Sequence, residues 1–192
     1  VGESDLALSL KTASNELRAR FFSSLSGDTA IAITEAMEAI GAPVHVVGCD
    51  IREPESIAAA FDEAESTFSL PSVLINNAAA NFPVPAEDMS PNAWRTVVDI
   101  TLNGTFRCTR AALQYMMPRQ SGIIVNNASV LGWRAQKGQA HYAAAKAGVM
   151  ALTRCAALEA AEAGVRINAV APSLAMHPFL SKVTPEALLR EL

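Results

Sequence analysis

Short apolar segments separated by long helical ones constrain this chain more than any other feature. Four runs rich in valine, isoleucine and alanine lie at residues 44–49, 73–76, 122–128 and 165–170. The runs are apolar throughout instead of alternating, which is typical of strands buried on both faces of a parallel sheet. The segments between them are long enough to cross back from one strand to the next. The sequence therefore predicts a parallel sheet covered by helices.

Three of the intervening segments carry helix signals. We expect helices at residues 55–68, 91–117 and 139–163. Ser90 is a favourable N-cap for the second of them, with Pro91 at its first helical position, and Pro118 ends it. Gly164 is placed to terminate the third helix. This alternation predicts an α/β fold with a doubly wound parallel sheet, of the Rossmann type with three α/β/α layers.

Length and composition narrow the class of protein. The 192 residues predict a single domain over residues 1–192. The net charge of −4, the scattered basic residues and the lack of a long apolar run exclude nucleic acid and a membrane as expected partners. The three cysteines lie far apart, so we expect buried free thiols and no metal site. With no signal-peptide pattern, we expect a cytoplasmic location.

Tyr142 and Lys146 are four residues apart on the third predicted helix, so their side chains leave one face. An ammonium about 4 Å from a phenol, at an effective dielectric of about 20, favours the phenolate by about 4 kcal/mol. We therefore expect Lys146 to lower the pKa of Tyr142 from about 10 to about 7. This spacing alone marks only a helical face. Ser129, at the carboxyl end of the predicted strand 122–128, makes proton transfer to an alcohol or carbonyl oxygen the better interpretation.

Several motifs together resemble the short-chain dehydrogenase/reductase family, in the family's order over residues 43–180. The family's serine, tyrosine and lysine fall on Ser129, Tyr142 and Lys146. INNAAAN is similar to its N-N-A-G motif, CDI to its adenine-contacting segment, and VRINAVAPS to its sixth strand and the turn that follows. The resemblance implies NAD or NADP as cofactor. The implied cofactor-binding residues are Asp50, Ile51, Asn76, Ala78, Tyr142, Lys146 and Pro172.

The chain also departs from the family pattern. No segment matches the family's glycine-rich phosphate loop, and the chain stops before the family's last strand, so we expect a sheet that is incomplete at both ends. Ala79 and Ser173 stand where the family has glycines. The helix asparagine that holds a relay water in the family corresponds to Thr101, which we expect to hold a water less well.

The segment around residues 76–106 is especially similar to the 2,4-dienoyl-CoA reductase branch. Asn81, which precedes Phe82, matches the asparagine that binds the thioester oxygen in that branch. The alternative for Asn81 is a loop asparagine that caps its own turn. The tyrosine on which that branch depends corresponds here to Leu131, whereas Tyr142 is present. The substrate-binding wall thus resembles the 2,4-dienoyl-CoA reductase branch, whereas the acid–base group resembles the alcohol dehydrogenase branch.

Other polar and aromatic residues lie close to the predicted catalytic set. We expect Trp133 and Arg134 at the edge of the substrate pocket, where Arg134 would meet a carboxylate or a CoA phosphate; a plain surface arginine is the alternative. His141 is expected to point off the reactive face and to have no catalytic role.

These observations predict an NAD(P)-dependent oxidoreductase. It would interconvert a secondary alcohol and a ketone on a small molecule, such as an acyl-CoA or another lipid-like substrate. Two alternatives stay open: a 2,4-dienoyl- or enoyl-CoA reductase that uses Asn81, and a cofactor-free relative with a role in assembly or regulation. The resemblance also implies that the helices at 91–117 and 139–163 pair across a homodimer, often within a homotetramer.

Overall fold

The computed structural model describes residue 45 and residues 47–173. The chain divides into two compact units, Val1–Pro71 and Ser72–Leu192, and each is described by itself. In the first unit, helix α4 (Pro54–Thr67) has a proline in its first turn and buries Ile57 and Phe61. The strand expected at residues 44–49 is not found at its described positions, because no described segment pairs with them. Residues 44 and 46 lie outside the described residues.

The described part of the second unit is built on a parallel sheet in the order β1-β2-β3. The strands are β1 (Val73–Asn76), β2 (Gly122–Asn127) and β3 (Val165–Val170). In the register, Ile75 is opposite Val125, and Val125 is in turn opposite Asn168. All three strands lie where the apolar runs predicted them.

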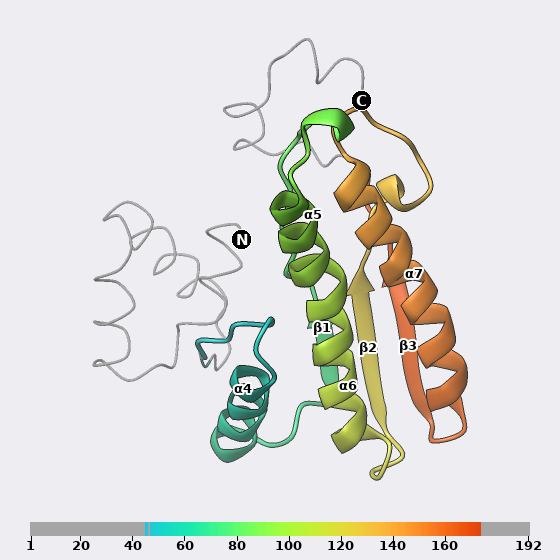
Figure 1. Cartoon of the computed structure of the whole chain (residues 1–192). Helices are drawn as coiled ribbons and strands as arrows, with labels where there is room; N and C mark the ends of the chain where they lie inside the picture. The colour runs from blue at the N-terminus through green and yellow to red at the C-terminus, as the bar shows by residue number, and fades with distance from the viewer. Residues whose placement is uncertain (1–44, 46, 174–192) are drawn as a thin grey trace, which may run out of the picture. The chain divides into compact units, whose positions relative to one another are not determined.

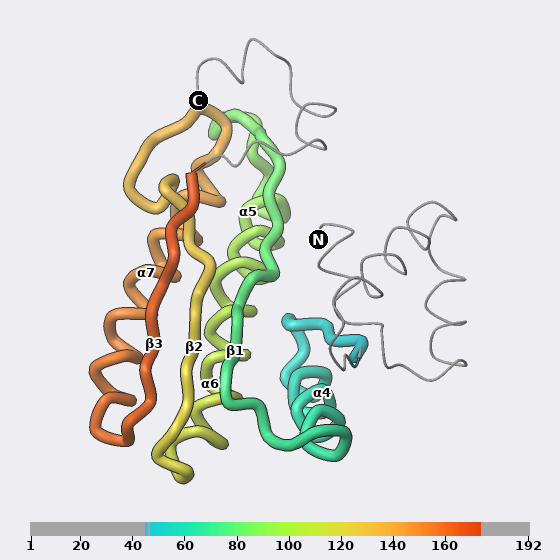
Figure 2. Tube along the Cα trace, turned by 180° about the vertical axis from the view of Figure 1, so that it is seen from behind, coloured from blue at the N-terminus to red at the C-terminus, as the bar shows by residue number. Residues whose placement is uncertain are grey.

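Helices cover one face of this sheet. Figure 1 shows α5 (Pro91–Val98), α6 (Gly104–Met116) and α7 (Ala140–Ala161) on the same side of the strands, and Figure 2 shows the strands from behind, in front of the helices. On the face toward the helices Ile124 and Ile167 are buried, whereas Val73 and Ile75 on the other face are 47% and 66% exposed. The described residues of this unit thus form two layers of an α/β Rossmann-type fold.

The helix expected at residues 91–117 is interrupted by a π-helical turn, Asp99–Asn103, between α5 and α6. It begins as predicted, because Ser90 Oγ accepts a hydrogen bond of 3.1 Å from the N–H of Ala93. Thr101, inside the π turn, is fully buried. Such turns occur often at functional sites, and hydrophobic periodicity gives no signal for them.

The end of α7 requires a glycine. Gly164 has φ +70°, and a Cβ atom there would lie 2.9 Å from the carbonyl oxygen of Gln120. A residue with a side chain would therefore be strained by its backbone angle and would also clash with main chain. The structure ends α7 at Ala161, two residues before the expected end, and Gly164 closes the turn that follows, with its N–H donating to the carbonyl oxygen of Ala161 at 2.9 Å.

A buried polar network ties the sheet to both long helices. Asn76 Nδ2 donates to Asn126 Oδ1 at 2.8 Å and to Thr109 Oγ1 at 3.0 Å, and Asn126 Nδ2 donates to Thr153 Oγ1 at 2.9 Å. The four residues belong to β1, β2, α6 and α7, and each is at most 9% exposed. The network therefore fixes the elements whose ends carry the predicted catalytic residues.

Candidate active site

Ser129 lies directly after β2, at the carboxyl edge of the sheet. It has an extended backbone and caps the short 3₁₀ turn Val130–Gly132, with Oγ accepting from the N–H of Leu131 at 3.2 Å. The N–H of Val130 donates to the carbonyl oxygen of Pro172 at 3.1 Å, which ties this turn to the segment after β3. Because Oγ already accepts from a main-chain amide, the serine hydroxyl is oriented so that its proton can be donated to a neighbouring oxygen.

The phenol of Tyr142 is within hydrogen-bonding reach of this serine. Tyr142 lies in the first turn of α7, and its side chain lies close enough to that of Ser129 for the serine to act against the rise of the phenol pKa. One turn further along α7, Nζ of Lys146 lies 5.5 Å from the centre of the Tyr142 ring. The structure therefore brings together the three residues that the sequence analysis singled out.

Lys146 is almost completely buried, with 3% of its surface exposed. Its Nζ donates to the main-chain carbonyl oxygen of Asn127, at the end of β2, at 2.5 Å. Burial lowers the pKa of Lys146 from 10.5 to about 8, because a charged amine is disfavoured away from water. Its other N–H donors have no partner among the residues that the structure describes.

The expected effect of Lys146 on the tyrosine is wrong in direction. Burial raises the pKa of the Tyr142 phenol above 10.0, and the hydrogen bond with Ser129 works against that rise. The reason is the direction of the ammonium group: it donates to the Asn127 carbonyl and lies 5.5 Å from the ring centre. Desolvation therefore outweighs attraction, and the phenol keeps its proton at neutral pH.

The neighbourhood of Lys146 fits a ligand that carries hydroxyl groups. Asn127 Nδ2 donates to Asn77 Oδ1 at 2.6 Å, whereas Asn127 Oδ1 is buried with no partner in the described part of the chain. The unpaired buried acceptor of Asn127 and the unpaired protons of the amine that binds its carbonyl oxygen are costly unless a ligand satisfies them. The ribose of a nicotinamide cofactor has hydroxyls of this kind, so the residues present fit that group.

Two further residues predicted for cofactor binding lie in this unit with exposed surfaces. Ala78 follows β1 and presents only a methyl group, and Pro172 uses its carbonyl oxygen to hold Val130. Asn76 differs, because its side-chain amide is committed to the buried network. A cofactor contact at position 76 would therefore fall to the main chain.

Asp50 and Ile51, predicted to contact adenine, belong to the first unit. The Asp50 carboxylate accepts from Nε and Nη2 of Arg52 at 2.9 and 2.5 Å, and its N–H donates to Ser56 Oγ at 2.9 Å. These bonds form a tight turn before α4. The contact with adenine stays a prediction.

The loop after β1 carries the predicted substrate asparagine. Asn81 is exposed, and its side chain has no hydrogen-bond partner among the described residues, so it does not cap its own turn there. The preceding residue is fixed: the N–H of Ala80 donates to Thr101 Oγ1 at 3.1 Å, and this hydroxyl donates to the Ala80 carbonyl at 3.2 Å. Thr101, expected to hold a water, thus uses its hydroxyl to hold this loop.

The other predicted pocket residues are open to solvent in the described structure. Trp133 is 64% exposed and Arg134 is also exposed, both just after the 3₁₀ turn that Ser129 caps. Their substrate contacts stay predictions. Of the cysteines, Cys49 and Cys155 are exposed and only Cys108 is buried, so the expectation of buried thiols is wrong for two of them.

Sequence reasoning missed the contribution of Asn127. Its carbonyl oxygen receives Lys146 and its side chain pairs with Asn77. A polar residue at the end of an apolar run was a usable signal for the side chain. No sequence signal exists for the carbonyl oxygen, because every residue has one.

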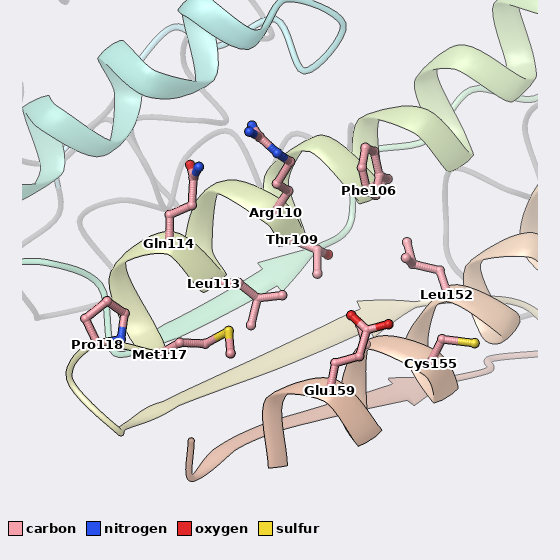
Figure 3. Close-up of a pocket in the computed structure, with 11 residues that line it drawn as sticks. Phe106, Thr109, Arg110, Leu113, Gln114, Met117, Pro118, Leu152, Cys155 and Glu159 are labelled. Atoms are coloured by element: carbon pink, nitrogen blue, oxygen red, sulfur yellow. The ribbon is translucent and has the colours of Figure 1, made fainter. Parts of the chain in front are cut away.

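A hollow of about 530 Å³ lies elsewhere, between α6 and α7. Figure 3 shows side chains of both helices lining it, among them Phe106, Leu113 and Met117 from the α6 side and Leu152 and Cys155 from α7. Leu152 is ten residues beyond Tyr142, which corresponds to about 15 Å along a helix. The hollow is therefore separate from the catalytic residues.

Two kinds of feature are absent from the residues that the structure describes. No helix among residues 45 and 47–173 is long and apolar enough to cross a membrane. Within the same residues, no group of three or more histidine, cysteine, aspartate or glutamate side chains is placed to hold a metal ion.

A parallel sheet with serine, tyrosine and lysine side chains gathered at its carboxyl edge defines an α/β protein of the Rossmann type. The family model for short chain dehydrogenases matches residues 6–187 of this chain. The chain belongs to the short-chain dehydrogenase family.

Named relatives refine the comparison. The chain is 52% identical over 154 residues to (5R,7aS)-5-hydroxy-7a-methyl-1-oxo-2,3,5,6,7,7a-hexahydro-1H-indene-carboxyl-CoA reductase of Mycobacterium tuberculosis, covering 80% of this chain and 58% of the relative. It is 45% identical over 125 residues to a "probable 2,4-dienoyl-CoA reductase [(2E)-enoyl-CoA-producing]" of Bacillus subtilis, covering 64% of this chain and 49% of the relative. The chain thus spans about half the length of these curated relatives.

A solved structure is also similar. The crystal structure of a short chain dehydrogenase from Mycobacterium smegmatis aligns with a TM-score of 0.71 at 46% identity. The alignment covers 76% of this chain and 61% of that one.

Proposed function

We propose that this protein is an NAD(P)-dependent oxidoreductase that interconverts a secondary alcohol and a ketone on an acyl-CoA or similar thioester. The observation that carries the proposal is the placement of the Ser129 hydroxyl, the Tyr142 phenol and the buried amine of Lys146 together at the carboxyl edge of the sheet. A phenol placed with a second hydroxyl donor suits the oxygen of an alcohol or ketone.

Each residue has a separate role. Ser129, oriented by the N–H of Leu131, donates to the substrate oxygen and holds it beside the phenol. Tyr142 transfers the proton at Oη. Lys146 and Asn127 would hold the nicotinamide ribose through their unpaired donors and acceptor. When bound, the nicotinamide exchanges a hydride with the carbon that bears the oxygen.

The raised pKa of Tyr142 favours one direction at neutral pH. A protonated phenol can give its proton to the oxygen of a ketone, whereas alcohol oxidation needs the phenolate to accept one. We therefore expect ketone reduction to be the faster direction near neutral pH. The cofactor preference between NAD and NADP stays open, and the cytoplasmic location stays a prediction.

The test offers ketone substrates to the purified protein. A 3-oxoacyl-CoA and a ring ketone linked to CoA are each supplied with NADH or NADPH, and consumption of the reduced cofactor is followed by absorbance. Consumption that depends on the ketone supports the proposal. If neither ketone leads to consumption of the reduced cofactor but a 2,4-dienoyl-CoA does, the proposal is overturned in favour of the runner-up.

That runner-up is a 2,4-dienoyl-CoA reductase, and a specific observation favours it. Asn81 is exposed and free of hydrogen bonds among the described residues, so its amide is available to a thioester oxygen. The similarity to the Bacillus subtilis relative points the same way. Replacing Asn81 with alanine separates the two: diene reduction would fall far more than ketone reduction.

A cofactor-free role in assembly or regulation is tested by titration. The oxidoreductase proposal predicts saturable binding of NADH or NADPH, read from the quenching of protein fluorescence. Binding of neither would favour the cofactor-free alternative, whatever the result with substrates.

We also propose that the hollow between α6 and α7 is where a second copy of the chain packs in a homodimer. Phe106 at its edge is 48% exposed and Met117 is 37% exposed. Arg110 and Glu159 line the same hollow with opposite charges. A two-fold axis brings each surface patch against its own copy, so such a patch can complement itself.

A further inference from the structure

His141 is the residue before the proposed acid–base tyrosine, and it is completely buried. Its Nδ1 accepts a hydrogen bond of 2.8 Å from the N–H of Tyr142. That amide belongs to the first turn of α7, whose N–H groups have no partner within the helix. An accepting Nδ1 places the proton of a neutral imidazole on Nε2, and Nε2 is buried with no partner in the described part of the chain.

The ring of His141 also makes an aromatic contact. The ring of Phe82 meets the ring of His141 edge to face, with ring centres 5.1 Å apart and an angle of 89° between the planes. Phe82 is 41% exposed, so the contact covers only part of its ring. Pairs of this geometry are mutually stabilising.

Phe82 lies in the middle of a loop that is otherwise held by its main chain. At one end Ala80 is bonded to the hydroxyl of Thr101, and at the other the N–H of Val84 donates to the carbonyl oxygen of Gly138 at 3.0 Å. Between these two anchors, the contact of Phe82 with His141 is the side-chain interaction that holds the described loop residues 81–83. Asn81 is therefore positioned through its neighbour Phe82.

We propose that His141 is a positioning residue that couples the substrate loop, residues 80–84, to the catalytic helix and thereby sets which thioester substrates are accepted. One nitrogen holds the main chain of Tyr142 while the ring holds Phe82 beside Asn81. The buried unpaired Nε2–H is consistent with this role, because stability alone would favour an apolar side chain at this position. The proposal rests on the proposed function and on the prediction that Asn81 contacts the thioester.

The variants separate the two contacts. His141→Asn keeps an oxygen that can accept from the N–H of Tyr142 and loses the ring, Phe82→Leu loses the opposite ring, and His141→Phe keeps a ring without the acceptor. For His141→Asn and Phe82→Leu we expect KM for the thioester to rise by about three- to tenfold with kcat nearly unchanged. The double variant should resemble either single one, because both remove the same contact. His141→Phe should keep KM close to that of the unmodified protein.

A matched control exists in the first unit. His45 and Phe68 form another edge-to-face pair, with ring centres 6.4 Å apart. Phe68→Leu should leave KM unchanged. A rise in KM that multiplies in the double variant, or singles that leave KM unchanged, would overturn the proposal.

A second measurement does not need turnover. Amide hydrogen exchange of peptides that cover residues 78–90 should be faster in His141→Asn and in Phe82→Leu, to the same extent. Unchanged exchange overturns the coupling. If the unmodified protein reduces no ketone or diene while the two variants exchange faster, the proposed function has failed and the coupling of loop to helix stands.

Discussion

Lys146 combines a functional position with an energetic penalty. The residue is 3% exposed, and burial lowers the pKa of its amine from 10.5 to about 8. Below pH 8 both the folded and the unfolded chain carry the proton on Lys146. Burial of this charge then lowers the free energy of unfolding by its full amount. Between 8 and 10.5 the unfolded chain binds more protons than the folded one, so the free energy of unfolding rises with pH. Above 10.5 both forms are neutral.

This rise of the free energy of unfolding with pH gives a prediction for Lys146→Met. The variant should be more stable than the unmodified protein near pH 7, by at most about 3 kcal/mol, because the apolar side chain avoids burying a charge but also loses the hydrogen bond to the Asn127 carbonyl oxygen. The stability gap should shrink by about 2 kcal/mol as pH rises from 8 to 9.5. Urea unfolding at several pH values measures it.

The quantity to compare is the difference in the free energy of unfolding between Lys146→Met and the unmodified protein, because Cys49 and Tyr142 also titrate. Both have raised pKa values, which lower stability at high pH equally in both proteins. The exposed Lys137, replaced by Met, is the control and should leave the pH profile unchanged. A Lys146→Met protein that is less stable than the unmodified one at pH 7 contradicts the burial argument.

At the scale of single residues, the sequence predicted which residues form the site better than it predicted their pKa values. Ser129, Tyr142 and Lys146 could be named because each is marked by residue type and by its place at a strand end or on one helical face. The direction of the tyrosine pKa could not be predicted, because it depends on how deeply the ring is buried and where the amine points. The role of Thr101 was equally hidden, since its partner is a main-chain group 21 residues away.

Elements were predicted well where a run of apolar residues or a capping residue marks them. Strands β1 and β3 and the start of α5 fall where the sequence places them. The π turn at Asp99–Asn103 was not predictable, because hydrophobic periodicity gives no signal for it. The strand expected at residues 44–49 is not found at residues 45 and 47–49, because an apolar run does not by itself supply a pairing partner.

The buried network gives a prediction at the scale of elements. Asn126→Ala should lower the free energy of unfolding by about 3 kcal/mol, because it leaves buried groups of Asn76 and Thr153 unpaired. The exposed Asn168 in β3, replaced by Ala, should cost less than about 0.5 kcal/mol. Urea unfolding of both variants measures the difference.

A double variant sharpens this test. Adding Thr153→Val to Asn126→Ala should cost less than the sum of the two single changes, because they share one hydrogen bond. Equal losses for Asn126→Ala and Asn168→Ala would mean that the network does not hold the elements together.

For the whole molecule, the proposed dimer makes the clearest prediction. Light scattering after size-exclusion chromatography should give a mass two or four times the 20.3 kDa of one chain. Phe106→Glu should lower that mass, because it puts a charge into the apolar hollow between α6 and α7. Phe68→Glu, an exposed phenylalanine in the first unit, should not. A monomeric unmodified protein, or an unchanged mass for Phe106→Glu, contradicts the proposal.

In the proposed oxidoreductase mechanism, the phenol of Tyr142 is the group that exchanges a proton with the substrate oxygen. Tyr142→Phe removes one oxygen atom and keeps the ring. Turnover of a ketone thioester with NADH or NADPH is measured in this variant, together with cofactor affinity by fluorescence titration. We predict that turnover falls by about a thousandfold or more while cofactor affinity stays within about threefold. Turnover close to that of the unmodified protein would contradict the central claim.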